Sequence, residues 1–293
     1  PAFENAGIKQ IINGPFTFAP DGNPLVGPVK GMTNFWSACA VMAGFSQGGG
    51  VGLALANWIV NGDPGFDVWA MDISRFGDYA SMAYTNARVR ENYSRRFSIR
   101  YPNEELQAAR PLLTTSIYDR QKQAGAQFGA AFGLEVPQWF APDGTADVFS
   151  WRRSVDFDHV GTEANAVRSA VGLGDISGFA KYEVSGSGAE AWLDRLLAAT
   201  MPPIGRMTLA PMLKDDGKII GDFSLARLGD KRFLIIGSGI AESYHMRWFL
   251  SHLPDDGSVR VKSLGLDLVG LTIAGPKARE VLQKCRRTDI SHD

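Results

Sequence analysis

The clearest restriction on the fold comes from residues 179–264, where strand-like and helix-like segments follow one another in a fixed order. Apolar residues recur every second position in some segments and every three or four positions in others, which distinguishes strands from helices. The expected strands are Phe179–Val184, Ile219–Leu228, Arg232–Ile236 and Val259–Leu264, and the expected helices are Gly188–Ala199 and Ala241–Leu253. Gly229-Asp230 joins the second and third strands as a hairpin would. This βαββαβ order predicts the split, ferredoxin-like arrangement.

A weak internal repeat accompanies this order. The segment Val184-Ser185-Gly186-Ser187-Gly188-Ala189, followed by Leu193, is echoed by Ile273-Ala274-Gly275-Pro276-Lys277-Ala278, followed by Leu282. In both copies a strand-like segment reaches a glycine and passes into a helix-like segment with matching alanine and leucine positions. We therefore expect modular construction, with another strand–helix unit beginning near residue 267.

Three zones of different composition divide the 293 residues. Residues 1–75 are rich in glycine, proline and long apolar segments, residues 76–143 are more charged, and residues 144–293 hold the βαββαβ order. A chain of this length can hold about two domains of ordinary size. The zones predict a fold class that combines α/β and α+β structure, with a small linking domain in the middle.

Helix-like segments in the first two zones can be placed by their apolar spacing. Leu53–Val60 has the spacing of a buried helix, and Gly62 after it is a stop signal. In the second zone the pattern predicts helices at residues 87–96, 104–110 and 117–132.

Composition and charge limit the kinds of binding partner, metal or disulfide site and compartment that can be expected. The net charge of −1 gives no reason to expect nucleic acid or an anionic membrane as a partner. Apolar stretches such as Phe35–Phe45 are shorter than the ~20 residues that span a bilayer. Cys39 and Cys285 lie far apart and the histidines do not cluster, so we expect neither a disulfide framework nor a metal site. We expect a reducing, cytoplasm-like compartment, with the mitochondrial matrix as the alternative.

A run of glycines before the first helix-like segment is the most informative local feature. It consists of Gly44, Phe45, Ser46, Gln47, Gly48, Gly49, Gly50, Val51 and Gly52. Glycines let a planar or anionic ligand approach the backbone closely, and the start of a helix directs free N–H groups at such a ligand. We therefore expect a ligand-supporting turn here. The alternative is that the glycines only permit tight packing of the helix against a sheet.

Asp222 is the carboxylate that the sequence singles out. It lies in the middle of the strand-like run Ile219–Leu225, where aspartate is disfavoured. Alternation predicts that Ile220, Asp222 and Ser224 share one face of the strand. A buried or pocket-lining carboxylate needs a partner with N–H donors, which a pterin ring offers along one edge. The alternative is a solvated polar face of an edge hairpin.

A second glycine signal lies at Gly237-Ser238-Gly239-Ile240-Ala241-Glu242, between a strand and a helix. A dinucleotide site has glycine or alanine in the sixth position, whereas this sequence has Glu242. The glutamate side chain would bring negative charge close to a bound pyrophosphate, so a tight turn is the preferred interpretation.

Several segments together resemble the dimethylglycine/sarcosine dehydrogenase family. The C-terminal end of its D-amino-acid-oxidase-like FAD domain is the part similar to residues 20–27, 34–36, 44–46 and 55–59. Its central linking domain is resembled by residues 69–76, 91–93, 101–102, 125–129 and 139–140. Its domain of the glycine-cleavage aminomethyltransferase type is resembled by residues 163–168, 174–177, 217–222 and 237–239.

The resemblance implies a division of the chain and an activity. It implies the end of an FAD domain at residues 1–75, a linking domain at 76–143 and an incomplete folate-binding domain at 144–293. It implies FAD and tetrahydrofolate as cofactors and a small N-methylated amine or amino acid as the substrate, which is oxidatively demethylated. The glycine-rich segment would support the flavin, and Asp222 would face the pterin and assist proton transfer. The electron acceptor is not identified.

Departures from the family pattern leave alternatives open. The GxGxxG turn that holds the ADP half of FAD is missing, so we expect an internal piece of a larger protein that neither binds FAD tightly nor turns over substrate by itself. Some folate-binding relatives have tyrosine where this sequence has Leu209. A folate-binding module without redox activity is the alternative function.

Overall fold

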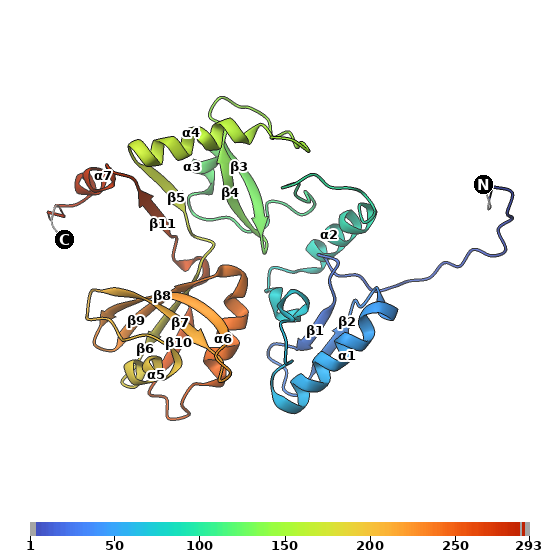
Figure 1. The fold of residues 1–293 in the computed structure, drawn as a ribbon, viewed down its shortest axis with the longest axis horizontal. Helices are drawn as coiled ribbons and strands as arrows, with labels where there is room; N and C mark the ends of the chain where they lie inside the picture. The colour runs from blue at the N-terminus through green and yellow to red at the C-terminus, as the bar shows by residue number, and fades with distance from the viewer. Residues whose placement is uncertain (1–3, 288, 291–293) are drawn as a thin grey trace. The chain divides into compact units, whose positions relative to one another are not determined.

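The computed structural model describes residues 4–287 and 289–290, which form two compact units. The first unit is drawn from Pro1–Ser74 and Met82–Phe97, and the second from Arg75–Ser81 and Ser98–Asp293. Both units contain helices and strands, as Figure 1 shows. This mixture confirms the predicted combination of α/β and α+β structure.

The first unit consists of a small hairpin, two helices and short 3-10 turns. Its elements are β1 (Leu25–Pro28), β2 (Trp36–Cys39), α1 (Gly44–Asn61) and α2 (Met82–Ser94), with the 3-10 segment Trp69–Met71 between the helices and Ile73–Arg75 at the unit boundary. β1 and β2 are antiparallel, with Val26 opposite Ala38. The helix expected at residues 87–96 is confirmed over 87–94, as the second half of α2.

Trp58 anchors α1 to the hairpin. Its buried indole lies 6.1 Å from the ring of Trp36, centroid to centroid. Gly27 has φ +113, and a Cβ added there would lie 2.8 Å from the Trp58 ring, so the strand approaches the indole this closely because residue 27 is glycine. Gly62 ends the helix with φ +77 and donates its N–H to the carbonyl of Trp58 at 2.9 Å. The predicted stop signal is confirmed.

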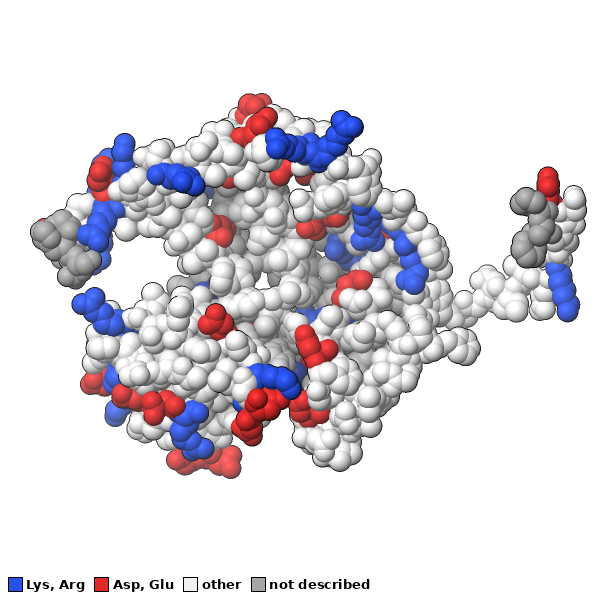
Figure 2. All heavy atoms as spheres, viewed as in Figure 1, with Lys and Arg blue, Asp and Glu red and all other residues white. Residues whose placement is uncertain are grey.

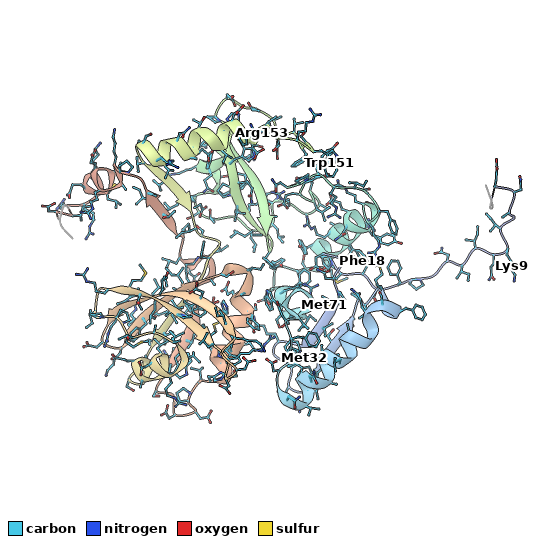
Figure 3. The ribbon with its side chains drawn as sticks, in the orientation of Figure 1. Lys9, Phe18, Met32, Met71, Trp151 and Arg153 are labelled. Carbon is cyan, nitrogen blue, oxygen red and sulfur yellow. The ribbon has the colours of Figure 1, made fainter. Side chains whose placement is uncertain are left out.

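The segment before β1 is attached to α2 through aromatic and polar contacts. The ring of Phe18, labelled in Figure 3, lies 5.5 Å from the ring of Tyr93 on α2. The neighbouring Asn92 is buried, and its Nδ2 donates to the carbonyl of Pro20 at 3.0 Å. The turn-rich residues before the hairpin are thus held by α2.

The second unit contains a helix that is shorter than predicted and a hairpin that the sequence pattern did not predict. Its elements here are α3 (Tyr118–Gln123), β3 (Ala126–Ala131), β4 (Leu134–Phe140) and α4 (Asp156–Ser169). The expected helix at 104–110 is wrong, and the one expected at 117–132 ends at Gln123. Gly125 explains the early end: it has φ +90, and a Cβ there would lie 2.4 Å from the carbonyl oxygen of Ala141. The chain therefore turns into β3 at a position that only glycine fits.

A buried ion pair fastens the long segment before α3 to this hairpin. Arg110 donates from Nε to Glu135 Oε1 at 2.9 Å and from Nη2 to Glu135 Oε2 at 2.7 Å. The same Nη2 donates to the carbonyl of Phe128 at 2.7 Å. The hydrogen bonds to Glu135 raise the pKa of the Arg110 guanidinium above its usual range, so the group stays positively charged at neutral pH.

The predicted ferredoxin-like order is confirmed, with one strand added. The elements are β6 (Ala180–Ser185), α5 (Ala189–Leu196), β7 (Met207–Leu213), β8 (Ile219–Gly229), β9 (Arg232–Gly237), α6 (Glu242–Ser251) and β10 (Arg260–Ser263). The strands form one antiparallel sheet in the order β10-β6-β9-β8-β7. β7, at the edge beside β8, is the strand that the pattern missed.

Helices cover one face of this sheet and leave the other open. The covered face carries the fully buried Tyr182, Phe223, Phe233 and Ile235, which pack with Leu193 of α5 and Phe249 of α6 in one core cluster. Figure 1 shows α5 and α6 against the sheet. Alternation along the strands turns the remaining side chains, among them Asp222 of β8, toward the open face.

The internal repeat predicted from the sequence is present in the backbone geometry. Gly186 and Gly275 have φ of +128 and +120, and each follows a strand and precedes a helix. Two residues later, Gly188 N donates to Ser258 O at 3.1 Å and Lys277 N donates to Ala170 O at 2.9 Å. The second copy is β11 (Leu271–Ala274) and α7 (Ala278–Cys285), and β11 pairs with β5 (Gly172–Asp175). The predicted second strand–helix unit is confirmed.

Charged side chains of both signs are mixed on the face drawn in Figure 2. Within the described residues, no helix combines the length and the apolar character that crossing a bilayer requires. Among residues 4–287 and 289–290, no three His, Cys, Asp or Glu side chains gather as metal ligands would. Cys39 and Cys285 are both exposed and unpaired with one another.

Candidate functional site

The glycine-rich segment at residues 44–52 is helical, which corrects the prediction of a turn. α1 begins at Gly44, and its first intrahelical bonds run from Ser46 N and Gln47 N to the carbonyl of Ala43, at 3.0 and 2.9 Å. Glycine within a helix costs about 1 kcal/mol relative to alanine, so the local preference was against this structure. Burial of Val51, Ala54 and Trp58 on the hairpin side offsets that cost.

The glycines of α1 leave a bare backbone surface. A Cβ added at Gly44, Gly48, Gly49, Gly50 or Gly52 would meet no atom of the described residues within 4 Å. Phe45 projects beside them with a fully exposed ring. Close packing against β1 and β2 therefore does not account for these glycines, because the packed side of α1 carries Val51, Ala54 and Trp58 instead.

The glycines at 237–239 form a tight turn, as preferred from the sequence. A Cβ at Gly239 would lie 1.7 Å from the carbonyl oxygen of Gly178, so the turn packs tightly against the chain's own backbone. Gly239–Ala241 forms a 3-10 turn before α6, and Ser263 Oγ donates to the carboxylate of Glu242. The observed geometry agrees with the preferred interpretation of a tight turn.

Asp222 lies on the open face of the five-stranded sheet, near its β7 edge. It is exposed and stands opposite Pro211 of β7. Within the part of the chain that the structure describes, its carboxylate has no hydrogen bond or ion pair, so its acceptor sites are available to a ligand. Solvent or a ligand must satisfy them.

The expected alternation around Asp222 is wrong at one position. Ile220 is 7% exposed and lies in the core, whereas Ile219 is 70% exposed. The pairing of β7 with β8 explains this, because Met212 stands opposite Gly221 and Leu213 opposite Ile219. Ile220 is thus the extra residue of a β-bulge, which turns its side chain inward. Asp222 and Ser224 still share the open face.

Apolar side chains surround Asp222 on the open face. Leu209 stands opposite Ser224 and is 72% exposed, and Met207 on the same edge strand is also exposed. Because residues two apart share a face, Leu209 and Pro211 lie beside Ser224 and Asp222 respectively. The result is a carboxylate next to an apolar surface, which suits a flat heterocycle with N–H donors along one edge.

Lys181 on the same face already makes hydrogen bonds to backbone carbonyls. Its Nζ donates to the carbonyls of Ser177 and Phe179 at 2.8 and 2.9 Å, and its side chain is buried. Burial lowers the pKa of its ammonium group. Lys181 therefore closes the turn between β5 and β6 and does not serve as the cationic partner of Asp222.

His245 is a residue whose place the sequence pattern did not reveal. Its imidazole is buried in the core, with Nε2 3.1 Å from the carbonyl oxygen of Ile220. The contact could not be predicted from residue spacing, because it depends on the bulge in β8.

Two family models match the chain in succession. The FAD dependent oxidoreductase central domain matches residues 61–115, and the GCVT N-terminal domain matches residues 117–293. Dimethylglycine dehydrogenase, mitochondrial, from Homo sapiens is 33% identical over 296 residues, covering 100% of this chain and 34% of the human protein. The 4-methylaminobutanoate oxidase (formaldehyde-forming) of Paenarthrobacter nicotinovorans is 31% identical over 302 residues, covering 100% of this chain and 36% of that protein.

The chain thus spans about a third of the length of these curated relatives. Among solved structures, the glycine cleavage system aminomethyltransferase T from Bartonella henselae superposes with a TM-score of 0.51 at 23% identity. That match covers 62% of this chain and 45% of the other. It shows the fold of the C-terminal part.

Proposed function

The chain belongs to the dimethylglycine/sarcosine dehydrogenase family, and from this premise we propose that the protein oxidatively demethylates a small N-methylated amine or amino acid with FAD and tetrahydrofolate. One observation carries the proposal: an FAD dependent oxidoreductase central domain and a GCVT N-terminal domain follow one another in a single chain. The names of the human and Paenarthrobacter relatives, which specify N-methylated substrates, support this choice of substrate class.

We place the flavin against residues 44–52 of α1. The bare glycine surface admits a planar ring, and the N–H groups at the start of the helix carry partial positive charge. Negative charge on a bound ligand would be stabilised there by about 0.5–1 kcal/mol. Bound FAD would supply the two-electron oxidation of the N-methyl carbon.

We place the pterin of tetrahydrofolate against the open face of the sheet. Asp222 would accept hydrogen bonds from N–H donors of the ring, and Leu209 and Pro211 would contact its flat apolar surface. The exposed carboxylate can also take up or return a proton during transfer of the one-carbon unit. The folate would supply the acceptor for that unit.

We propose the following division for these roles: residues 1–75 belong to the FAD domain, 76–143 to the linking domain and 144–293 to the folate-binding domain. The match of the GCVT N-terminal domain model begins earlier, at residue 117. We also propose a reducing, cytoplasm-like compartment, for which the two free cysteines Cys39 and Cys285 are suited. The human relative is named as a mitochondrial protein.

A substitution on the bare surface of α1 tests the flavin assignment in the complete protein. We expect Gly49→Leu to lower flavin occupancy and the reduction of flavin by dimethylglycine at least about tenfold, because the new side chain would stand where the ring approaches. Stability should not fall, since nothing described lies within 4 Å of the new Cβ and leucine favours helix. Visible absorbance of the flavin, with and without substrate, measures both effects.

Gly161→Ala in α4 is the matched control, because Gly161 is also helical with open space around it. It should leave flavin content and reduction unchanged. Full flavin occupancy in Gly49→Leu would remove α1 from the cofactor site. Wild-type protein that binds tetrahydrofolate but is never reduced by N-methylated amines would favour the folate-binding module without redox activity.

A second substitution tests the folate assignment. Asp222→Asn should weaken tetrahydrofolate binding about 10–100-fold, because a hydrogen bond to a charged group contributes about 1.5–3 kcal/mol. The melting temperature should hardly change, since the carboxylate has no partner within the described residues. Isothermal titration with tetrahydrofolate measures the affinity. Asp230→Asn in the hairpin turn is the control, and equal affinities in all three proteins would contradict the role of Asp222.

A further inference from the structure

We propose that His245 is a positioning residue for the folate site: its imidazole holds the β-bulge at Ile220 and thereby sets the direction of Asp222. The role in folate binding rests on the proposed function. The role of His245 in holding the bulge concerns the ligand-free chain and can be tested without folate.

The bulge leaves Ile220 outside the regular pairing of the sheet. On one side of β8, Gly221 and Ile219 have partners on β7 while Ile220 has none. On the other side, pairing with β9 begins only at Ser224. A backbone carbonyl in such a place requires a hydrogen bond from elsewhere, because a buried polar group left unsatisfied is costly.

His245 supplies that hydrogen bond from α6. Its Nε2 lies 3.1 Å from the carbonyl oxygen of Ile220. A carbonyl oxygen only accepts, so Nε2 carries the proton and Nδ1 is an acceptor. Burial lowers the pKa of the imidazole to about 4, so the neutral ring with a single N–H is the form present near neutral pH.

Tyr182 fixes the other side of the ring. Its hydroxyl lies 3.2 Å from His245 Nδ1 and donates to it, and the hydroxyl also reaches the carbonyl of Glu242 at 3.4 Å. Burial raises the pKa of the phenol, which keeps it protonated as a donor. β6 and α6 together therefore hold the imidazole against β8.

The imidazole contact lies two residues from the Asp222 carboxylate. A Cβ at Gly221 would be 2.4 Å from the Phe223 ring and 3.0 Å from His245 Nε2, so the strand is pressed against these rings between Ile220 and Asp222. A bulge rotates the residues that follow it, and loss of its anchor would let the strand slip toward regular pairing. The direction of Asp222 would change with it.

Three replacements at position 245 separate positioning from simple packing. Glutamine carries an N–H donor close to the position of Nε2, asparagine carries one close to the position of Nδ1, and leucine carries none. We expect His245→Leu and His245→Asn to shift the amide resonances of Gly221 and Asp222 and to speed hydrogen exchange at 219–222 about tenfold, while His245→Gln stays close to wild type. A structural role alone would not order the variants in this way.

Tyr182→Phe is the matched control in the ligand-free measurement. It removes the hydroxyl contact to the same imidazole but leaves the hydrogen bond to Ile220. It is expected to lower stability without shifting the resonances of Gly221 and Asp222 toward those of His245→Leu. All variants are compared at a temperature where each is fully folded by circular dichroism.

Titration with tetrahydrofolate supplies the second measurement. His245→Leu and His245→Asn should bind about tenfold more weakly than wild type, and His245→Gln within about threefold. If wild-type protein binds no tetrahydrofolate, the folate proposal fails, and the resonances and exchange rates still decide whether His245 holds the bulge. Wild-type resonances and exchange at 219–222 in His245→Leu, or equal behaviour of the Gln and Asn variants, would overturn the inference.

Discussion

Gly186→Ala should lower the free energy of unfolding of the second unit by about 3–5 kcal/mol, one of the largest effects expected of a single methyl group. Gly186 has φ +128, where side chains are strained, and the new Cβ would lie 2.1 Å from the carbonyl oxygen of Ser258. That oxygen belongs to the backbone and accepts the N–H of Gly188 at 3.1 Å, so it cannot move aside without losing the bond. Urea denaturation followed by circular dichroism measures the change.

Gly217→Ala separates backbone strain from the clash. Gly217 has φ +80 but no atom of the described residues within 4 Å of an added Cβ, so its replacement should cost about 1–2 kcal/mol. Gly275→Ala should resemble Gly186→Ala in kind, because its Cβ would lie 2.5 Å from the carbonyl oxygen of Ala170. A Gly186 variant no less stable than the Gly217 variant would show that the repeated turn is not tightly closed.

Glu135→Ala is the second substitution with a large expected effect. It should destabilise the second unit by about 3–5 kcal/mol, because it leaves the guanidinium of Arg110 buried without its partner. Arg110 and Glu135 are only 11% and 4% exposed, and two hydrogen bonds join them. Thermal unfolding monitored by calorimetry gives the loss.

An exposed pair in the same unit provides the comparison. Arg232 and Glu183 make the same kind of contact at 2.7 Å, but with 61% and 28% exposure, so Glu183→Ala should cost about 1 kcal/mol or less. Combining Glu135→Leu with Arg110→Met should recover much of the stability lost in the single variant, since no buried charge remains. A double variant as unstable as Glu135→Ala would mean that lost packing, not the unpaired charge, dominates.

Much of the C-terminal fold could be predicted because local signals agreed with one another there. Periodicity placed β6, β8, β9 and β10 within a residue or two, and the hairpin between β8 and β9 follows Gly229. Gly186 and Gly275 also read correctly as strand-to-helix turns, since an intrinsic backbone property of glycine made the signal.

The strand β7 and the start of α1 were missed for a different reason. β7 contains Pro211, and proline within a run argues against a central strand. The sheet tolerates it because β7 is paired only with β8 and lies at the edge. α1 begins among glycines that argue against helix, and the packing of Trp58 on the hairpin decides the outcome. In both cases tertiary context overrides local preference.

The candidate site also depends on tertiary contacts that the sequence does not reveal. Asp222 stood out because aspartate is unusual in mid-strand, and alternation placed it on the same face as Ser224, but the exposure of that face could not be read from the sequence. The bulge at Ile220 could not be read from alternation, since an extra residue reverses the pattern without changing the composition. The contact of His245 could not be predicted for the same reason, because its partner is the backbone carbonyl of Ile220, which only the bulge makes available.

The placement of β5 and β11 has a consequence for the order in which the chain acquires its structure. The five-stranded sheet lies entirely between them in sequence, yet its first and last strands along the chain, β6 and β10, are neighbours, with Tyr182 opposite Ser263. Once that sheet has formed, the ends of β5 and β11 are already close, and the entropy of closing the long intervening loop no longer opposes their pairing. During synthesis on the ribosome, β5 therefore stays unpaired until the five-stranded sheet has formed and β11 has been synthesised.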